Sequence, residues 1–320
     1  MRTTISRSTS SRAASRTTLI SQAWNRRPPI MAIRIVTDST ADLPADMAAS
    51  LGITVVPLYV HFGDEQLRDG IDISSEEFFE RLQSESRTPT TSQPPAGAFR
   101  DVYRELSADG SEIVSIHVSS KLSGTFASAQ QGAASLDGAE VRVVDSGAAS
   151  MALGMAAIAA AEAAVRGDSA DDVVAAAEDV LGRTHMLVIF DTLEYLRRGG
   201  RIGRGMELIG TLARLKPIAT IRDGEVAAAG RVRTKGKAIE EVLRRFSELR
   251  PLERAGVVHA TTPDECDYFA ERLHGLAPGI PITQGRIGPV LGVHAGPGVL
   301  GATVVTAPPA DAGGSPPTGE

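Results

Sequence analysis

Four hydroxyl side chains and a glycine gather in one short segment of the chain: Ser119, Ser120, Ser123, Gly124 and Thr125. The segment follows an apolar, β-prone run at residues 113–118 that is typical of a buried parallel strand. Small and apolar residues at helical spacing come after it. A strand end followed by a helix start exposes free N–H groups, and Gly124 would let a ligand approach the backbone. The pattern predicts an anion site with Ser120 and Ser123 as hydroxyl donors, although Ser123 as a simple helix cap is the structural alternative.

Two other segments hold polar side chains in restricted backbone settings. Thr91 and Ser92 lie in a proline-rich stretch, residues 87–98, whose prolines can neither continue a helix nor pair inside a sheet, and which leads into a helix predicted from about Ala96. This stretch is either a linker or a loop whose hydroxyl donors are held in place before a ligand arrives. His294 lies in a glycine- and proline-rich stretch, residues 288–298, which we interpret as a loop that positions the imidazole without covering it. A lone histidine is more often structural, but its glycine neighbours favour a binding role.

Several kinds of chemistry lack the residues they need. The single cysteine, Cys266, excludes an internal disulfide, and no Cys/His cluster indicates zinc. There is no G-x-S-x-G motif, and Asp38 and Asp145 each follow a predicted strand without an assignable acid–base partner. The glycine- and arginine-rich residues 197–205 lack the phosphate-loop pattern, so we interpret them as a helix end and a basic surface. The residues indicate binding of a carboxylate or phosphate rather than catalysis, with no metal.

The composition argues against nucleic-acid binding and against a membrane-spanning segment. A formal net charge of -6 over 320 residues gives no support for nucleic-acid binding, and aromatic residues make up only 4% of the chain, too few for a base-stacking platform. No apolar run approaches the roughly 20 residues that cross a bilayer. We therefore expect a globular protein that binds a small ligand.

Strands and helices alternate along most of the chain, which predicts a doubly wound parallel sheet. Residues 53–62 are predicted as one strand with Pro57 at an edge or bulge. Asp223-Gly224 predicts a hairpin turn, and residues 263–276 predict a helix. Residues 1–31 are expected to be a disordered or misassigned extension and residues 307–320 a disordered tail.

Eight motifs then agree with one family. They are TDSTADLP, TSQP, SSKLSGTF, VDS, EYLRRGGRI, KPI, GRVRTKGKA and HAGPG, in this order across about residues 33–306. Together they resemble the DegV family of bacterial fatty-acid-binding proteins. The resemblance implies an α/β fold of two domains: a doubly wound parallel sheet at residues 32–148 and an α/β domain with a mixed sheet at residues 149–306. A long-chain fatty acid such as palmitate or oleate would lie between them.

The resemblance also implies a role for particular residues. Thr91 and Ser123 would hold the acyl carboxylate, and His294 would complete the polar network. Arg231 and Arg233 would face a separate fatty acid kinase that makes the acyl phosphate. This protein would itself be non-catalytic, free of cofactor and metal, and cytoplasmic, and a transient contact with a membrane surface stays open. The family loop often has a hydroxyl where this chain has Ala295. A phosphotransferase-like enzyme that uses the same anion site for a phosphorylated small molecule is the alternative.

Overall fold

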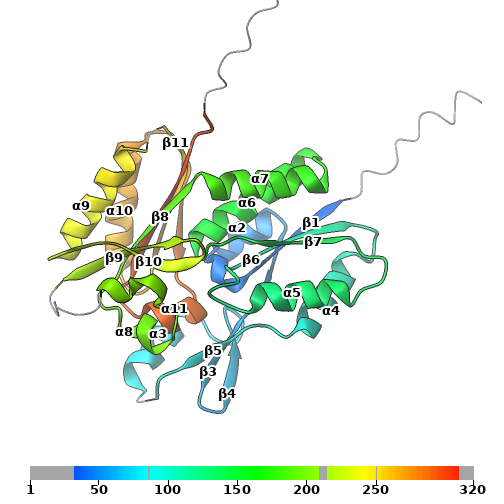
Figure 1. The fold of residues 1–320 in the computed structure, drawn as a ribbon, viewed down its shortest axis with the longest axis horizontal. Helices are drawn as coiled ribbons and strands as arrows, with labels where there is room; N and C mark the ends of the chain where they lie inside the picture. Colours follow the sequence, from blue (N-terminus) through cyan, green and yellow to red (C-terminus); the bar gives the residue numbers. More distant parts are fainter. Residues whose placement is uncertain (1–31, 86, 209–214, 250, 310–320) are drawn as a thin grey trace, which may run out of the picture.

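The computed structural model describes residues 32–85, 87–208, 215–249 and 251–309. These residues form three sheets with helices around and between them (Figure 1). The predicted N-terminal extension and residues 310–320 of the predicted tail lie outside the described residues. Within the described part of the chain, no helix has both the length and the apolar character required to span a membrane.

The first sheet is parallel throughout, and its strand order is β2-β1-β6-β7. Its strands are β1 (Ile33–Asp38), β2 (Ile53–Val56), β6 (Glu112–His117) and β7 (Val141–Asp145). Apolar side chains leave both faces of β1, because Ile35 and Val36 are both buried but belong to different core clusters. One face is covered by α4 (Ala96–Leu106) and α5 (Thr125–Ala134). The other is covered by α2 (Ala45–Ser50), α6 (Met151–Arg166) and α7 (Ala170–Gly182), which confirms the doubly wound sheet.

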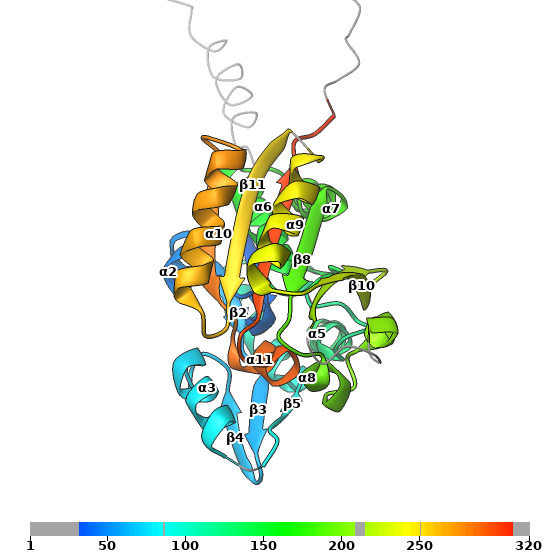
Figure 2. The ribbon, with the colours of Figure 1, turned by 90° about the vertical axis from the view of Figure 1, so that its left-hand side faces the viewer.

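The second sheet is mixed, with the strand order β10-β9-β8-β13-β11-β12. Its strands are β8 (Thr184–Ile189), β9 (Lys216–Arg222), β10 (Glu225–Val232), β11 (Leu252–His259), β12 (Ile282–Arg286) and β13 (Leu300–Thr306). Only β11 and β12 run parallel, and every other neighbouring pair is antiparallel. Its outer face is covered by α9 (Lys235–Ser247) and α10 (Pro263–Leu276), which lie side by side in Figure 2. The expected α/β fold with a mixed second sheet is thus confirmed.

Helix α6 lies between the two large sheets and contributes to the core of both. Met151 and Met155 pack in the cluster that contains Val258 and Val305 of the mixed sheet. Ala156 and other alanines of α6 pack in the cluster of the parallel sheet. The small side chains allow this close packing of three layers. The domain boundary between residues 148 and 149 stays a prediction.

The third sheet is small and antiparallel, with the order β4-β3-β5. It consists of β3 (Tyr59–Phe62), β4 (Glu65–Arg68) and β5 (Thr90–Ser92), and α3 (Ser75–Ser84) follows β4. The prediction of one strand over residues 53–62 is therefore wrong. Pro57 offers no N–H to a sheet ladder, and the chain changes sheets there. The predicted loop before the helix is also wrong at residues 90–92, where β5 forms and Thr91 pairs with Val60, whereas the predicted helix start at about Ala96 is confirmed.

Two short helices complete the described fold around the ends of the mixed sheet: α8 (Glu194–Arg198) and α11 (Pro289–Ala295). The prediction of a loop over residues 288–298 is wrong for residues 289–295. Pro289 at the first helical position and Gly296, with φ of 77°, begin and end α11. His294 thus lies in the last turn of a helix rather than in a loop. Two 3-10 turns, η1 (Ser39–Ala41) and η2 (Gly203–Leu208), follow β1 and α8.

Candidate functional site

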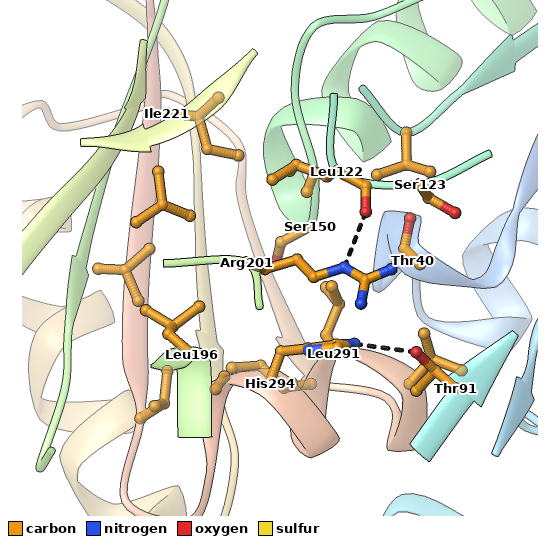
Figure 3. A pocket seen from close by; sticks show the side chains of 18 of the residues that line it. Thr40, Thr91, Leu122, Ser123, Ser150, Leu196, Arg201, Ile221, Leu291 and His294 are labelled. Atoms are coloured by element: carbon orange, nitrogen blue, oxygen red, sulfur yellow. Dashed lines mark hydrogen bonds between the residues drawn. The ribbon is translucent and has the colours of Figure 1, made fainter. Parts of the chain in front are cut away.

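A pocket lies between the parallel sheet, the mixed sheet and α11 (Figure 3). It encloses about 1010 Å³ of space free of protein atoms, part of which is open to solvent. Most of its walls are apolar, with side chains from β8, β9, β10 and α8 such as Val188, Leu196, Ile221 and Val226, and with Phe190 just after β8.

The polar side chains of the pocket gather at one end of it. In Figure 3, Thr40, Thr91 and Ser123 lie on the side opposite Leu196 and Ile221. They come from the turn after β1, from β5 and from the turn before α5. These elements end at the carboxyl edge of the parallel sheet or beside it, where open α/β sheets bind ligands. The pocket therefore has the shape and polarity of a site for a molecule with one polar end and a long apolar part.

The imidazole of His294 meets the Thr91 hydroxyl across this polar end. Thr91 Oγ1 lies 2.9 Å from His294 Nε2, although 203 residues separate them in the sequence. Burial, with a smaller contribution from the positive charge of Arg201, lowers the pKa of His294 to about 4, so the ring is neutral near pH 7. Its Nδ1 is buried and has no hydrogen-bond partner among the described residues. A Cβ at position 199 would collide with this atom, which explains the glycine there.

Arg201 extends into the middle of the polar end, between Ser123 and His294 (Figure 3). Its Nε donates to the carbonyl oxygen of Leu122 at 3.1 Å and its Nη1 to that of Gly199 at 2.8 Å. No carboxylate whose side chain the structure describes forms a salt bridge with it. The pocket thus holds a guanidinium that is oriented by backbone carbonyls.

Arg201 was not among the residues predicted for the site. The interpretation of residues 197–205 as a helix end and a basic surface holds for Arg197 and Arg198, which both pair with Glu194. Gly200, with φ of 69°, turns the chain back so that Arg201 enters the pocket instead. The signal was the motif EYLRRGGRI, which contains Arg201 and was used only for the family resemblance.

Four of the predicted ligand residues line this one pocket: Thr91, Ser92, Ser123 and His294. The Ser123 hydroxyl also lies 2.8 Å from Thr125 Oγ1 and accepts from the Thr125 N–H, so it supports the start of α5 as well. The Ser92 hydroxyl is bonded to His61 Nε2 at 2.8 Å.

The other predicted residues lie outside the pocket lining. Gly124 is beside Ser123, and a Cβ there would collide with the Gln93 amide, so this glycine serves contact between two loops. Ser120 is exposed, and its N–H donates to Asp145 at 3.1 Å. Arg231 and Arg233 are exposed at and just beyond the end of β10. The ligand and partner roles assigned to all these residues stay predictions.

A second line of polar contacts runs through the core of the parallel sheet. Asp38 Oδ2 lies 3.0 Å from His117 Nδ1, and His117 Nε2 lies 2.7 Å from the Ser115 hydroxyl. These are the contacts of a Ser–His–Asp triad. All three side chains are 0% exposed. The Tyr103 hydroxyl lies 2.8 Å from Ser115 Oγ, so the serine hydroxyl has a second hydrogen-bond partner. Because Ser115 is enclosed in this way, the line is a satisfied polar network of the core and not a nucleophile site.

Comparisons with known proteins agree with this architecture. The model of the DegV family, described as "Uncharacterised protein, DegV family", matches residues 32–307. A DegV domain-containing protein of Streptomyces coelicolor is 41% identical over 277 residues, which are 85% of this chain and 98% of the relative.

Two solved structures are similar along their whole length. One describes fatty acid binding by a DegV family protein of Thermus thermophilus, with a TM-score of 0.81, 38% identity, and coverage of 87% of this chain and 100% of that one. The other is DegV of Bacillus subtilis, described as a fatty acid binding protein, with a TM-score of 0.80, 33% identity and the same coverage. The family resemblance found in the sequence is confirmed, and the chain belongs to the DegV family.

Proposed function

We propose that this protein binds a long-chain fatty acid in the pocket, with the carboxylate at the polar end and the alkyl chain along the apolar walls. The observation that carries the proposal is Arg201, a guanidinium held by backbone carbonyls at the polar end of a pocket whose other walls are mostly apolar. The two solved relatives described as fatty acid binding support the same ligand class.

Several polar side chains would bind the carboxylate together, each through a different interaction. Arg201 supplies the positive charge, and the hydroxyls of Thr91 and Ser123 donate hydrogen bonds. Because His294 is neutral, its Nε2–H can donate to Thr91 Oγ1, which leaves the hydroxyl hydrogen of Thr91 free for the ligand. A carboxylate that leaves water needs most of its acceptor positions filled, and these groups are enough to do so.

The apolar walls would supply most of the affinity. Burying one methylene group contributes about 0.8 kcal/mol, so a sixteen-carbon chain contributes on the order of 10 kcal/mol before the cost of ordering it. Palmitate or oleate fits this description. The same walls favour an acyl chain over the phosphorylated small molecule of the phosphotransferase alternative, because phosphate esters of metabolites carry little apolar surface.

We further propose that the protein is a non-catalytic carrier in bacterial lipid metabolism. It would present the bound acid to a separate fatty acid kinase in the cytoplasm, where ATP is available for making the acyl phosphate. The exposed Arg231 and Arg233 would face that kinase. Turnover of ATP by the purified protein alone, in the presence of magnesium, would instead favour the phosphotransferase alternative.

Mass spectrometry of the purified protein tests the ligand directly. We expect an excess mass under native conditions that disappears on denaturation and matches a fatty acid in the lipid extract. A protein that carries no lipid and does not take up added palmitate or oleate would rule the proposal out.

A further inference from the structure

Two buried carboxylates that the binding role does not use lie behind the polar end of the pocket. Asp42 follows η1, and Asp69 follows β4; their exposed fractions are 6% and 4%. Asp42 Oδ1 accepts from the Gly288 N–H at 2.8 Å, and Asp69 Oδ2 accepts from the Val290 N–H at 3.4 Å. The first N–H groups of a helix have no partner inside it, so the two carboxylates complete the start of α11.

Helix α11 is the element that brings His294 to the pocket. Near its middle, Gly292 lies directly against the rings of Phe78 and Phe79 from α3, with no room for a Cβ. Together with the two carboxylates at its first turn, this packing determines where its last turn, and therefore the imidazole, is located. A shift of α11 would change the 2.9 Å contact between His294 and Thr91.

Each aspartate connects α11 to a different part of the polar end. The Asp69 N–H donates to the Leu58 carbonyl at 2.9 Å, immediately before the small sheet in which Thr91 pairs with Val60. Asp69 therefore ties the strand that carries Thr91 to the helix that carries His294. Asp42 does the same for the turn that carries Thr40.

Backbone geometry around Asp42 shows that this junction is closely constrained. Asp42 and Ser150 have φ of 50° and 55°, a region that residues other than glycine seldom occupy. The Ser150 hydroxyl donates to Asp42 Oδ2 at 2.5 Å, and its N–H donates to the Thr40 carbonyl at 2.7 Å. Such backbone persists only where the surroundings hold it, and it is concentrated at functional sites.

Burying the carboxylates of Asp42 and Asp69 close together is also electrostatically costly. Burial raises the pKa of Asp42 and of Asp69 to about 7, and the nearby Asp38 adds to the effect in both. Stability alone does not account for three carboxylates so close together in a core. The hydrogen bonds of Asp42 and Asp69 to α11 give these two carboxylates a role beyond stability.

We propose that Asp42 and Asp69 are positioning residues for carboxylate recognition, which hold α11 so that His294 and Thr91 meet at the polar end of the pocket. The inference rests on the proposed fatty-acid binding. It assigns the two aspartates an effect on the acid end of the ligand and none on the alkyl chain.

The test compares two ligands that differ only at that end, hexadecanoic acid and hexadecan-1-ol. We expect Asp42→Ala and Asp69→Ala to weaken binding of the acid about tenfold or more, and of the alcohol less than about twofold, because a misplaced hydrogen bond to a charged group is the costly loss. Asp42→Asn and Asp69→Asn should restore most of the acid affinity, since the amide oxygen still accepts from α11. Asp101→Ala, an exposed aspartate of α4, is the matched control and should change neither affinity.

Failure of the positioning role and failure of the proposed fatty-acid binding give different outcomes. Wild-type protein that does not bind hexadecanoic acid contradicts the proposed function itself. The positioning role is contradicted if wild-type protein prefers the acid and the alanine variants keep that preference. It is also contradicted if the variants lose affinity for both ligands equally. Should an alanine variant fail to fold, Asp42→Ser or Asp69→Ser replaces it, because a hydroxyl and a water can fill the buried polar space, and the same acid-to-alcohol ratio decides.

Discussion

The charge at the polar end of the pocket comes from Arg201, whose two hydrogen bonds go to backbone carbonyls. A guanidinium held in this way is already oriented before the ligand arrives. It therefore loses little conformational freedom on binding, which makes it an effective partner for a planar carboxylate.

Replacing Arg201 by glutamine tests this role. We expect Arg201→Gln to weaken fatty acid binding by about 1.5–3 kcal/mol, roughly 10- to 150-fold, because a hydrogen bond to a charged group is lost. Arg198→Gln is the matched control, since Arg198 lies on the preceding turn and pairs with Glu194 on the surface. Displacement of a fluorescent fatty acid gives both affinities. Equal binding by Arg201→Gln and wild type would remove Arg201 from the site.

At this scale, the sequence showed some side chains of the site and hid others. Thr91, Ser123 and His294 were visible because hydroxyls and an imidazole stood out among prolines and glycines. Arg201 was hidden because arginines and glycines after a helix are equally typical of an ordinary helix end. Asp69 was hidden because only the tertiary fold brings it to α11, 221 residues away in the chain.

Among the elements, the β9–β10 hairpin directly contacts the turn between β6 and α5, which carries Ser119 and Ser123. Its tip consists of Asp223 and Gly224, both at positive φ, as the predicted hairpin turn requires. The Ser119 hydroxyl donates to the Gly224 carbonyl at 2.8 Å, and no Cβ fits between them. The hairpin thus supports the loop that carries Ser123 from the side of the mixed sheet.

Gly224→Ala tests this support, and Gly138→Ala is the matched control. Gly138 also follows an aspartate and has positive φ, but a Cβ there meets nothing within 4 Å. Both alanine variants carry the backbone strain, and only Gly224→Ala also crowds Ser119. We expect it to be less stable than Gly138→Ala by about 1–3 kcal/mol in urea denaturation. Equal stability of the two variants would show that the hairpin contact is dispensable.

Long elements were predictable and short ones were not. Residues 263–276 form α10 with the predicted bounds, because fourteen residues give a clear helical period and Pro263 marks the start. Helix α11 has only seven residues, too few for periodicity to compete with its glycines and prolines. The break at Pro57 and the short strand β5 were missed because their partners are defined by the fold and not by local pattern.

For the whole molecule, the buried aspartates make stability depend on pH. The pKa of Asp42 and of Asp69 is raised from 3.8 to about 7, so the folded state binds protons that the unfolded state has released. Their stabilising contribution is therefore complete below pH 3.8 and is lost as pH rises towards 7, by about 1.4 kcal/mol per pH unit for each group. His294, with its pKa lowered to about 4, acts in the opposite direction below pH 6.5, and so do His185 and His259, whose pKa values burial also lowers.

We therefore expect the free energy of unfolding to fall between pH 5.5 and about 7, and the Asp42→Asn, Asp69→Asn double variant to lose most of this slope. Urea denaturation at several pH values measures both proteins. The His294→Gln variant separates the contribution of His294. A wild-type slope that survives in the double variant would place its origin elsewhere.

The alternation of strands and helices was enough to predict the fold class of the whole molecule, and the strand order was beyond it. In the mixed sheet the last strand, β13, lies between β8 and β11. Nothing local in residues 300–306 indicates a central place, because a buried strand has the same composition wherever it pairs.

This central place of β13 has a consequence for how the protein is made. A chain still under synthesis has Thr91 and Ser123 early, but it lacks His294 and the strand that joins the two halves of the mixed sheet. Contacts between residues so distant in sequence form late in folding. The proposed binding site is therefore incomplete in a nascent chain until β13 has left the ribosome, and binding of a fatty acid would report that synthesis has passed Thr306.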